Sequence, residues 1–196
     1  CLVFTMTMAE RRAAEYHLER QISNILKDIT PNMSEFDKEL HLHDRLMEIC
    51  RYHQEAADSK DPYTEYPDAF SAYGALVKGA AVCEGYARAM QLLCHRVGIA
   101  CTLVSGYGIK NQMTHMWNLV TIDGRNYHLD PTWNDGDIGY RHVYFNVTTE
   151  EIQRTHQIDN DNIGINTCIA EEANYYRKTG LYLDTFSAEE IGKVVA

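Results

Sequence analysis

Apolar residues in the first quarter of the chain recur at helical spacing. Over residues 8–29 they fall on one stripe, which is formed by Tyr16, Ile22, Ile25, Leu26 and Ile29. This spacing predicts an amphipathic helix that ends before Pro31. Residues 34–54 repeat the pattern, and Ser34, with Asp37 three positions later, is typical of a helix N-terminus.

A third helix is predicted over residues 83–97, after a loop over 57–68 that is rich in Asp, Ser and Pro. Its apolar residues recur on one face and are Tyr86, Met90, Leu93 and Val97. Gly98 is placed to cap the C-terminus of this helix, because glycine adopts the left-handed conformation without strain.

The pattern then changes to an alternation of apolar and polar residues, which is typical of strands. We expect four strands, over residues 100–107, 116–122, 125–130 and 141–147. Thr148 followed by Glu151 indicates the start of a further helix. Helices first and consecutive strands afterwards predict an α+β fold with an antiparallel sheet.

The pair Asp123-Gly124 predicts a two-residue hairpin between two of these strands, because the tight type I′ turn needs positive φ at both positions. In that register Trp117 lies opposite Asp130. Since alternate residues of a strand share a face, His115 and Asp130 become diagonal neighbours, roughly 7–8 Å apart between Cβ atoms. An imidazole and a carboxylate can bridge that distance.

Cys83 follows a small-residue turn and opens the third predicted helix. The unpaired N–H groups and the dipole at a helix N-terminus favour the thiolate, which is the form in which cysteine attacks. The backbone N–H of Cys83 can also point at a developing oxyanion. His115 would then act as general base and acid, and Asp130 would fix the tautomer and orientation of the imidazole.

Four segments around these residues carry a family resemblance. They read Val-Cys-Glu-Gly-Tyr-Ala, Arg-Val-Gly-Ile-Ala-Cys, His-Met-Trp-Asn and Tyr-His-Leu-Asp-Pro-Thr-Trp-Asn-Asp. In this order they resemble the core of the transglutaminase-like superfamily, in its bacterial branch. The resemblance implies a papain-like architecture, with the catalytic triad on Cys83, His115 and Asp130.

The resemblance also guides the division of the chain and the choice of further site residues. We expect an N-terminal helical extension over 1–35, a catalytic core over 36–156 and a C-terminal extension over 157–196 that packs on the core.

Crosslinking enzymes of this superfamily in animals carry an oxyanion-stabilising Trp upstream of the cysteine. No Trp precedes Cys83 here, and Tyr73 is our candidate replacement. Candidates for the substrate cleft, with core packing or support as the alternative, are Trp117, Trp133 and His128.

Composition restricts the partners. The net charge is −10 and no basic stripe occurs, which argues against a nucleic-acid partner, and no apolar run approaches the roughly 18 residues of a membrane span. The six cysteines lack CxxC spacing, so neither a structural zinc site nor another cofactor is expected. We expect three of them to be buried, namely Cys50, Cys94 and Cys101. The oxygen-rich residues 159–162 are interpreted as a solvated turn and not as a metal site.

Together these features favour thiol-dependent acyl transfer on amide or peptide bonds of a protein or peptide substrate, with hydrolysis favoured over transfer to an amine. One alternative is a catalytically silent module that binds protein or cell-wall ligands; another is a metal-dependent hydrolase. The chain does not begin with Met, so we expect it to start inside a longer gene product. An extracellular or cell-surface bacterial location is favoured over a cytoplasmic one, and the oligomeric state stays open.

Overall fold

The structure is a computed structural model that describes residues 7–136, 139, 141–159 and 167–182. Its strands are β1 (Arg51–Tyr52), β2 (Ala80–Ala81), β3 (Cys101–Gly108), β4 (Thr114–Ile122), β5 (Arg125–Leu129) and β6 (His156–Ile158). The last four form an antiparallel sheet in the order β5-β4-β3-β6, and the first two form a small parallel sheet. The predicted α+β fold class is confirmed.

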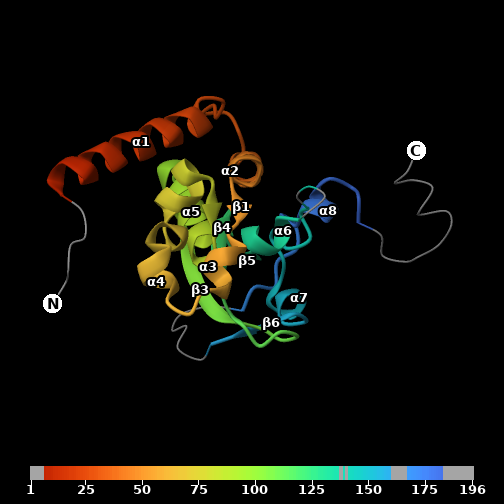
Figure 1. Cartoon of the computed structure of the whole chain (residues 1–196). Coiled ribbons are helices and arrows are strands. Elements are labelled where there is room, and N and C mark those ends of the chain that lie inside the picture. The colour runs from red at the N-terminus through yellow and green to blue at the C-terminus, as the bar shows by residue number, and fades with distance from the viewer. Residues whose placement is uncertain (1–6, 137–138, 140, 160–166, 183–196) are drawn as a thin grey trace.

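Helices cover this sheet on the side of the N-terminal half of the chain (Figure 1). The helices of the described residues are α1 (Met8–Leu26), α2 (Glu35–Ile49), α3 (Gln54–Asp58), α4 (Pro62–Glu65), η1 (Pro67–Phe70), η2 (Gly74–Lys78), α5 (Cys83–Arg96), α6 (Pro131–Asn134), α7 (Thr149–Ile152) and α8 (Tyr175–Lys178), of which the last three belong to the C-terminal half. Helix α5 packs against β3 and β4, and α2 packs against α5. The largest buried cluster of apolar side chains lies between these elements.

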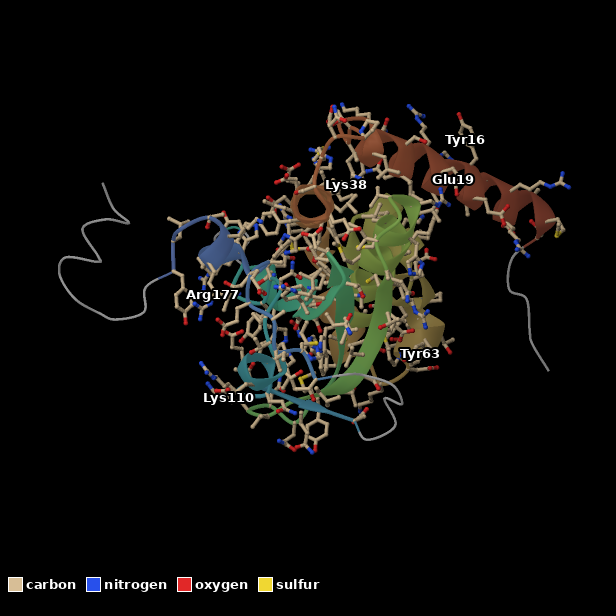
Figure 2. The ribbon with its side chains drawn as sticks, turned by 180° about the vertical axis from the view of Figure 1, so that it is seen from behind. Tyr16, Glu19, Lys38, Tyr63, Lys110 and Arg177 are labelled. Carbon is tan, nitrogen blue, oxygen red and sulfur yellow. The ribbon has the colours of Figure 1, made fainter. Side chains whose placement is uncertain are left out.

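Helix α1 contacts the rest of the molecule through its C-terminal half. Ile22 and Ile25 are buried in the main core, and Arg96 at the end of α5 donates two hydrogen bonds to Glu19. The first turns project from the body, and Tyr16 points into solvent (Figure 2). The C-terminal part of the predicted stripe therefore anchors this helix, but Tyr16 does not belong to the buried face, and the helix ends at Leu26 and not at residue 29.

The second predicted helix is shorter than expected. It begins after Ser34, whose side chain accepts the N–H of Asp37, but it ends at Ile49 and not at residue 54. The residues that follow form β1, which pairs with β2, a segment far away in the sequence. This long-range pairing overrides the local helical pattern.

The predicted loop over 57–68 contains short helices, so that expectation is wrong in detail. Pro62 and Pro67 each lie in the first turn of a helix, α4 and η1. Proline is accepted there because its missing N–H would have no intrahelical partner anyway. The two prolines, from which the sequence predicts a loop, are therefore the residues that begin these two helices.

The predicted hairpin and its register are confirmed. Ile122 pairs with Arg125 and Asn118 pairs with Leu129, with Asp123 and Gly124 both at positive φ. One face of β4 turns toward α5, where Asn118 donates a hydrogen bond to the carbonyl of a helix residue. The opposite face carries His115, Trp117 and Leu119, because side chains alternate along a strand.

The strand predicted over 141–147 is wrong. Phe145 N–H bonds back to the His142 carbonyl, and Asn146 has a φ of 56°, so the backbone turns and does not extend. Val147 alone forms an isolated bridge with His128. The fourth strand of the sheet is β6, while the predicted helix start at Thr148 is confirmed as the capping box of α7.

Five cysteines lie within the described residues, and all five are free thiols. Cys50, Cys94 and Cys101 are buried, as expected, whereas Cys1 and residues 160–162 of the oxygen-rich stretch lie outside the described residues. Within the described part of the chain, no helix has the length and apolar character that a membrane crossing requires. The division at residues 35 and 156 stays a prediction.

Candidate active site

Cys83 occupies the first position of α5, where the sequence predicts it. The chain before α5 packs closely against the first turn of this helix, because Gly85 has no side chain there. A Cβ added at Gly85 would lie 2.5 Å from the carbonyl oxygen of Ala69 and 2.7 Å from the Cβ of Ala81. The first N–H groups of α5 have no intrahelical partner, so they remain available beside the thiol.

His115 and Asp130 meet as the hairpin register predicts. Nε2 of His115 lies 2.7 Å from Oδ2 of Asp130, and both side chains are buried. Asp130 also caps α6, where its Oδ1 accepts the N–H of Trp133 at 3.2 Å. Because Asp130 occupies Nε2, Nδ1 is the ring nitrogen left to face Cys83.

The electrostatics of this pair favour an imidazolium beside a carboxylate. Burial alone would lower the pKa of His115, but the charge and hydrogen bond of Asp130, together with a hydrogen bond to Cys83, raise it to about 10. Burial would likewise raise the pKa of Asp130, yet His115 and His156 hold it below its usual value of 3.8. At neutral pH the ring therefore carries a proton that it can give up.

A cavity of about 410 Å³ opens in front of the thiol and the imidazole. It is lined by Tyr52, Gln54, Cys83, Gly108, Asn111, Met113, Thr114, His115, Thr132, Trp133 and Asp135. Aromatic and neutral polar side chains dominate this wall. Asp135 is its single acidic residue, and Tyr86 donates a hydrogen bond to that carboxylate. The arrangement presents the sulfur and the ring to a ligand from outside.

Of the three predicted cleft residues, Trp133 alone lines this cavity. Trp117 and His128 are fully buried behind His115, so the expectation that they form cleft walls is corrected. The Trp117 ring stacks on His115, and its Nε1–H donates to Nδ1 of His128 at 3.1 Å. Burial, with the nearby His156, lowers the pKa of His128 to about 4, so His128 is a neutral support.

Tyr73, the predicted oxyanion residue, does not line the cavity. It precedes η2, and the Lys78 ammonium lies 5.6 Å from the centre of its ring. Gln54 does line the cavity. One N–H of its side-chain amide donates to Oδ1 of Asp58 at 2.8 Å, which leaves the second N–H as a possible donor. Sequence reasoning missed Gln54 because it places this residue at the end of a helix, while the β1–β2 pairing brings the following residues to the cavity that Cys83 also lines.

Sequence reasoning also missed His156. Its Nε2 lies 3.0 Å from Oδ2 of Asp130, the oxygen that also accepts from His115, and the side chain is fully buried. The segment around His156 has too little apolar alternation to predict a strand. Only the pairing of β6 with β3 brings this residue to the site.

Among the described residues, two clusters have the residue types of a metal site. One is formed by His115, Asp130 and His156, and the other by His43, Asp44 and His142. In each cluster one aspartate oxygen lies 2.7–3.0 Å from two histidine nitrogens, which are hydrogen-bonding distances. Zinc ligands at about 2.0–2.1 Å from the metal would lie roughly 3.3 Å apart, so these donors would have to separate. Both sets fit hydrogen-bonded networks better than a metal ion.

The second network satisfies the ring nitrogens of His43 and one of His142. Tyr144 N–H donates to Oδ1 of Asn134, which leaves Nδ2 of Asn134 to donate to Nε2 of His43. Nδ1 of His43 then carries the proton toward Asp44, and Asp44 also accepts from His142. Asn134 lies in α6 directly after the site, so this network anchors the helix that Asp130 caps.

Comparison with known proteins agrees with this geometry. A family model of the transglutaminase-like superfamily matches residues 23–131, which is more than half of the chain. The chain belongs to this superfamily. The match includes Cys83, His115 and Asp130.

The chain is also similar to two curated relatives and to one solved structure. The chain is 31% identical over 101 residues to kyphoscoliosis peptidase of Mus musculus and 31% identical over 64 residues to that of Homo sapiens. These alignments cover 45% and 28% of the chain but 14% and 10% of the relatives, so the chain spans a small part of their length. A solved structure described as a TGase aligns with a TM-score of 0.54 at 16% identity, covering 70% of this chain and 36% of that one, which supports the fold.

Proposed function

We propose that this domain is a thiol-dependent acyl-transfer enzyme that acts on amide bonds of a protein or peptide substrate. The observation that carries the proposal is the arrangement of His115. One side of its ring is bonded to the buried Asp130, and the other faces Cys83 at the rim of an open cavity. A nucleophile, a base and an orienting group in this order are the parts of a cysteine acyl-transfer site.

The reaction follows from these positions. The Cys83 thiolate attacks the carbonyl carbon, and His115 gives its proton to the leaving amine, so that a thioester forms on the sulfur. Water then attacks the thioester, with His115 taking a proton back, and releases the carboxylic acid. We favour water over a second amine because the cavity is open to solvent and its wall carries many polar groups.

The oxyanion that forms during attack needs donors beside the sulfur. The backbone N–H of Cys83, at the head of α5, and the side-chain amide of Gln54 are our candidates, since both residues line the cavity. Gln54 replaces Tyr73 in this role. Asp130 stays ionised throughout and keeps the ring of His115 in place.

Selective alkylation of the native protein tests the proposal. Iodoacetamide should modify Cys83 faster than the four other cysteines of the described residues, which are all buried. The rate at slightly acidic pH should fall by about tenfold or more in His115→Gln, which cannot form the ion pair. Alkylation of Cys83 at the rate of a free thiol, unchanged by that substitution, would favour the silent binding module instead.

Product analysis separates the two acyl acceptors. The native protein is incubated with a glutamine-containing protein and a fluorescent primary amine. Peptide release or ammonia without amine incorporation supports hydrolysis, whereas incorporation identifies amine transfer. Cys83→Ser serves as the control for both, and resistance to chelators distinguishes the thiol enzyme from a metal-dependent hydrolase.

A further inference from the structure

His156 lies on the same face of the sheet as the proposed site, although it comes from another strand. In the β3–β4 pair Gly106 is opposite His115, and in the β3–β6 pair Gly108 is opposite His156. Opposed residues share a face, as do alternate residues of one strand. The two histidines therefore point to one side of the sheet. Their strands, β4 and β6, lie on either side of β3 (Figure 1).

The two glycines of β3 make room for this convergence. A Cβ at Gly106 would lie 2.8 Å from the ring of Trp117, and a Cβ at Gly108 would lie 3.2 Å from the ring of Trp133. With no side chain there, the tryptophans enclose His156, with ring centres 5.1 Å and 4.1 Å from its own. The imidazole is thus fixed by aromatic packing and shielded from water.

The hydrogen bonds of His156 fix the orientation of its ring. An ionised carboxylate only accepts, so Nε2 of His156 carries the hydrogen that points to Asp130 at 3.0 Å. Nδ1 lies 2.8 Å from the hydroxyl of Thr155, which can donate to it. His156 therefore supplies an N–H to Asp130 through Nε2, while its Nδ1 is held by the Thr155 hydroxyl.

We propose that His156 is a positioning residue, whose N–H holds the Asp130 carboxylate in the orientation that fixes His115. The inference rests on the proposed acyl-transfer function. Trp133 N–H holds Oδ1 and His156 holds Oδ2, so both oxygens have a partner other than His115. This matters because His115 changes its charge when it gives up a proton, and the carboxylate must keep its orientation through that step.

A matched pair of substitutions tests the role. His156→Gln keeps an N–H donor near the position of Nε2, while His156→Leu keeps the approximate volume without the donor. We expect His156→Leu to lower kcat by about tenfold or more with KM within about twofold, and His156→Gln to recover most of the loss. The alkylation rate of Cys83, followed from about pH 5 to pH 9, should lose its acidic limb in the Leu variant and keep it in the Gln variant.

Each outcome has a distinct meaning. If His156→Leu is folded by circular dichroism and keeps the native kcat and alkylation profile, the inference is wrong. Equal losses in the Gln and Leu variants would also overturn it, because the donor would then not matter. A native protein whose Cys83 shows no selective reactivity would refute the proposed function, and this inference with it.

Thr155 offers a second variant in case His156→Leu does not fold. Thr155→Val removes the hydroxyl that faces Nδ1 of His156 but keeps the shape of the side chain. We expect a smaller decrease in kcat in the same direction, about threefold, without a change in KM. An unchanged kcat in this variant would contradict the assigned hydrogen-bond chain.

Discussion

Glu39 in α2 provides a stability test that needs no substrate. Its side chain is fully buried, and Nδ2 of Asn146 donates to its Oε2 at 2.6 Å. Its Oε1 has no hydrogen-bond partner among the described residues. Burial, opposed by the Asn146 hydrogen bond and reinforced by the charge of Glu35, raises the pKa of Glu39 to about 8.

The magnitude follows from linkage between protonation and folding. The folded state keeps a proton on Glu39 up to about pH 8, while the unfolded chain releases it near pH 4.5. Unfolding therefore releases a proton between these values, and the stability contributed by this group falls as pH rises through that window. At about 1.4 kcal/mol per pKa unit, the loss between pH 5 and pH 7.5 is about 3 kcal/mol.

The substitution Glu39→Gln removes the titration and keeps the size of the side chain. Urea denaturation followed by circular dichroism should show that the variant gains about 3 kcal/mol relative to the native protein between pH 5 and pH 7.5. Glu48→Gln, at an exposed position of the same helix, should change stability by less than about 0.5 kcal/mol at either pH. A Glu39→Gln effect that does not vary with pH would refute the reasoning.

Three further predictions concern the sheet and the site. In Asp130→Asn the pKa of His115, measured by NMR of the imidazole, should fall well below about 10, because the charge of Asp130 is the main cause that raises it. In the native protein, the stability that this ion pair contributes is fully present below about pH 6.5 and is lost as pH rises through 10. The variant should lack this contribution. In Gly106→Ala the new Cβ would lie 2.0 Å from the carbonyl oxygen of Gln157, so β6 must shift and stability should fall by about 2 kcal/mol or more in urea melts, with the exposed Thr102→Ala on the same strand as control. His128 has its pKa lowered to about 4, so native stability should fall as pH drops from 6.5 toward 4, and His128→Gln should show a smaller drop in thermal melts; an equal drop in both proteins would contradict the neutral state of His128.

The local part of the site was predictable because short-range physics controls it. The type I′ turn at Asp123 and Gly124 sets the register of β4 and β5, and the register alone brings His115 to Asp130. The position of Cys83 at a helix N-terminus follows from the small-residue turn and the apolar stripe after it. In both cases the interacting residues are close in sequence, so local patterns carry the information.

The sequence-based predictions are wrong where contacts with distant segments determine the backbone conformation or the burial of a side chain. The residues predicted as the last strand turn at Asn146 because His142 and Asn146 bond to α2, at Asp44 and Glu39. Trp117 was placed in the cleft because its face was predicted correctly, but alternation along a strand does not distinguish the open end of a face from its buried centre.

The sequence by itself determined the three reactive groups, their order and the hairpin that joins two of them, since turn chemistry and strand alternation act over a few residues. Only the tertiary structure decided that β6 pairs with β3, that His156 shares the carboxylate of Asp130 and that Gln54 lines the same cavity as Cys83. These contacts join segments separated by long stretches of chain. Such contacts form because the whole domain buries apolar surface when it folds, and a pattern of a few neighbouring residues cannot predict them.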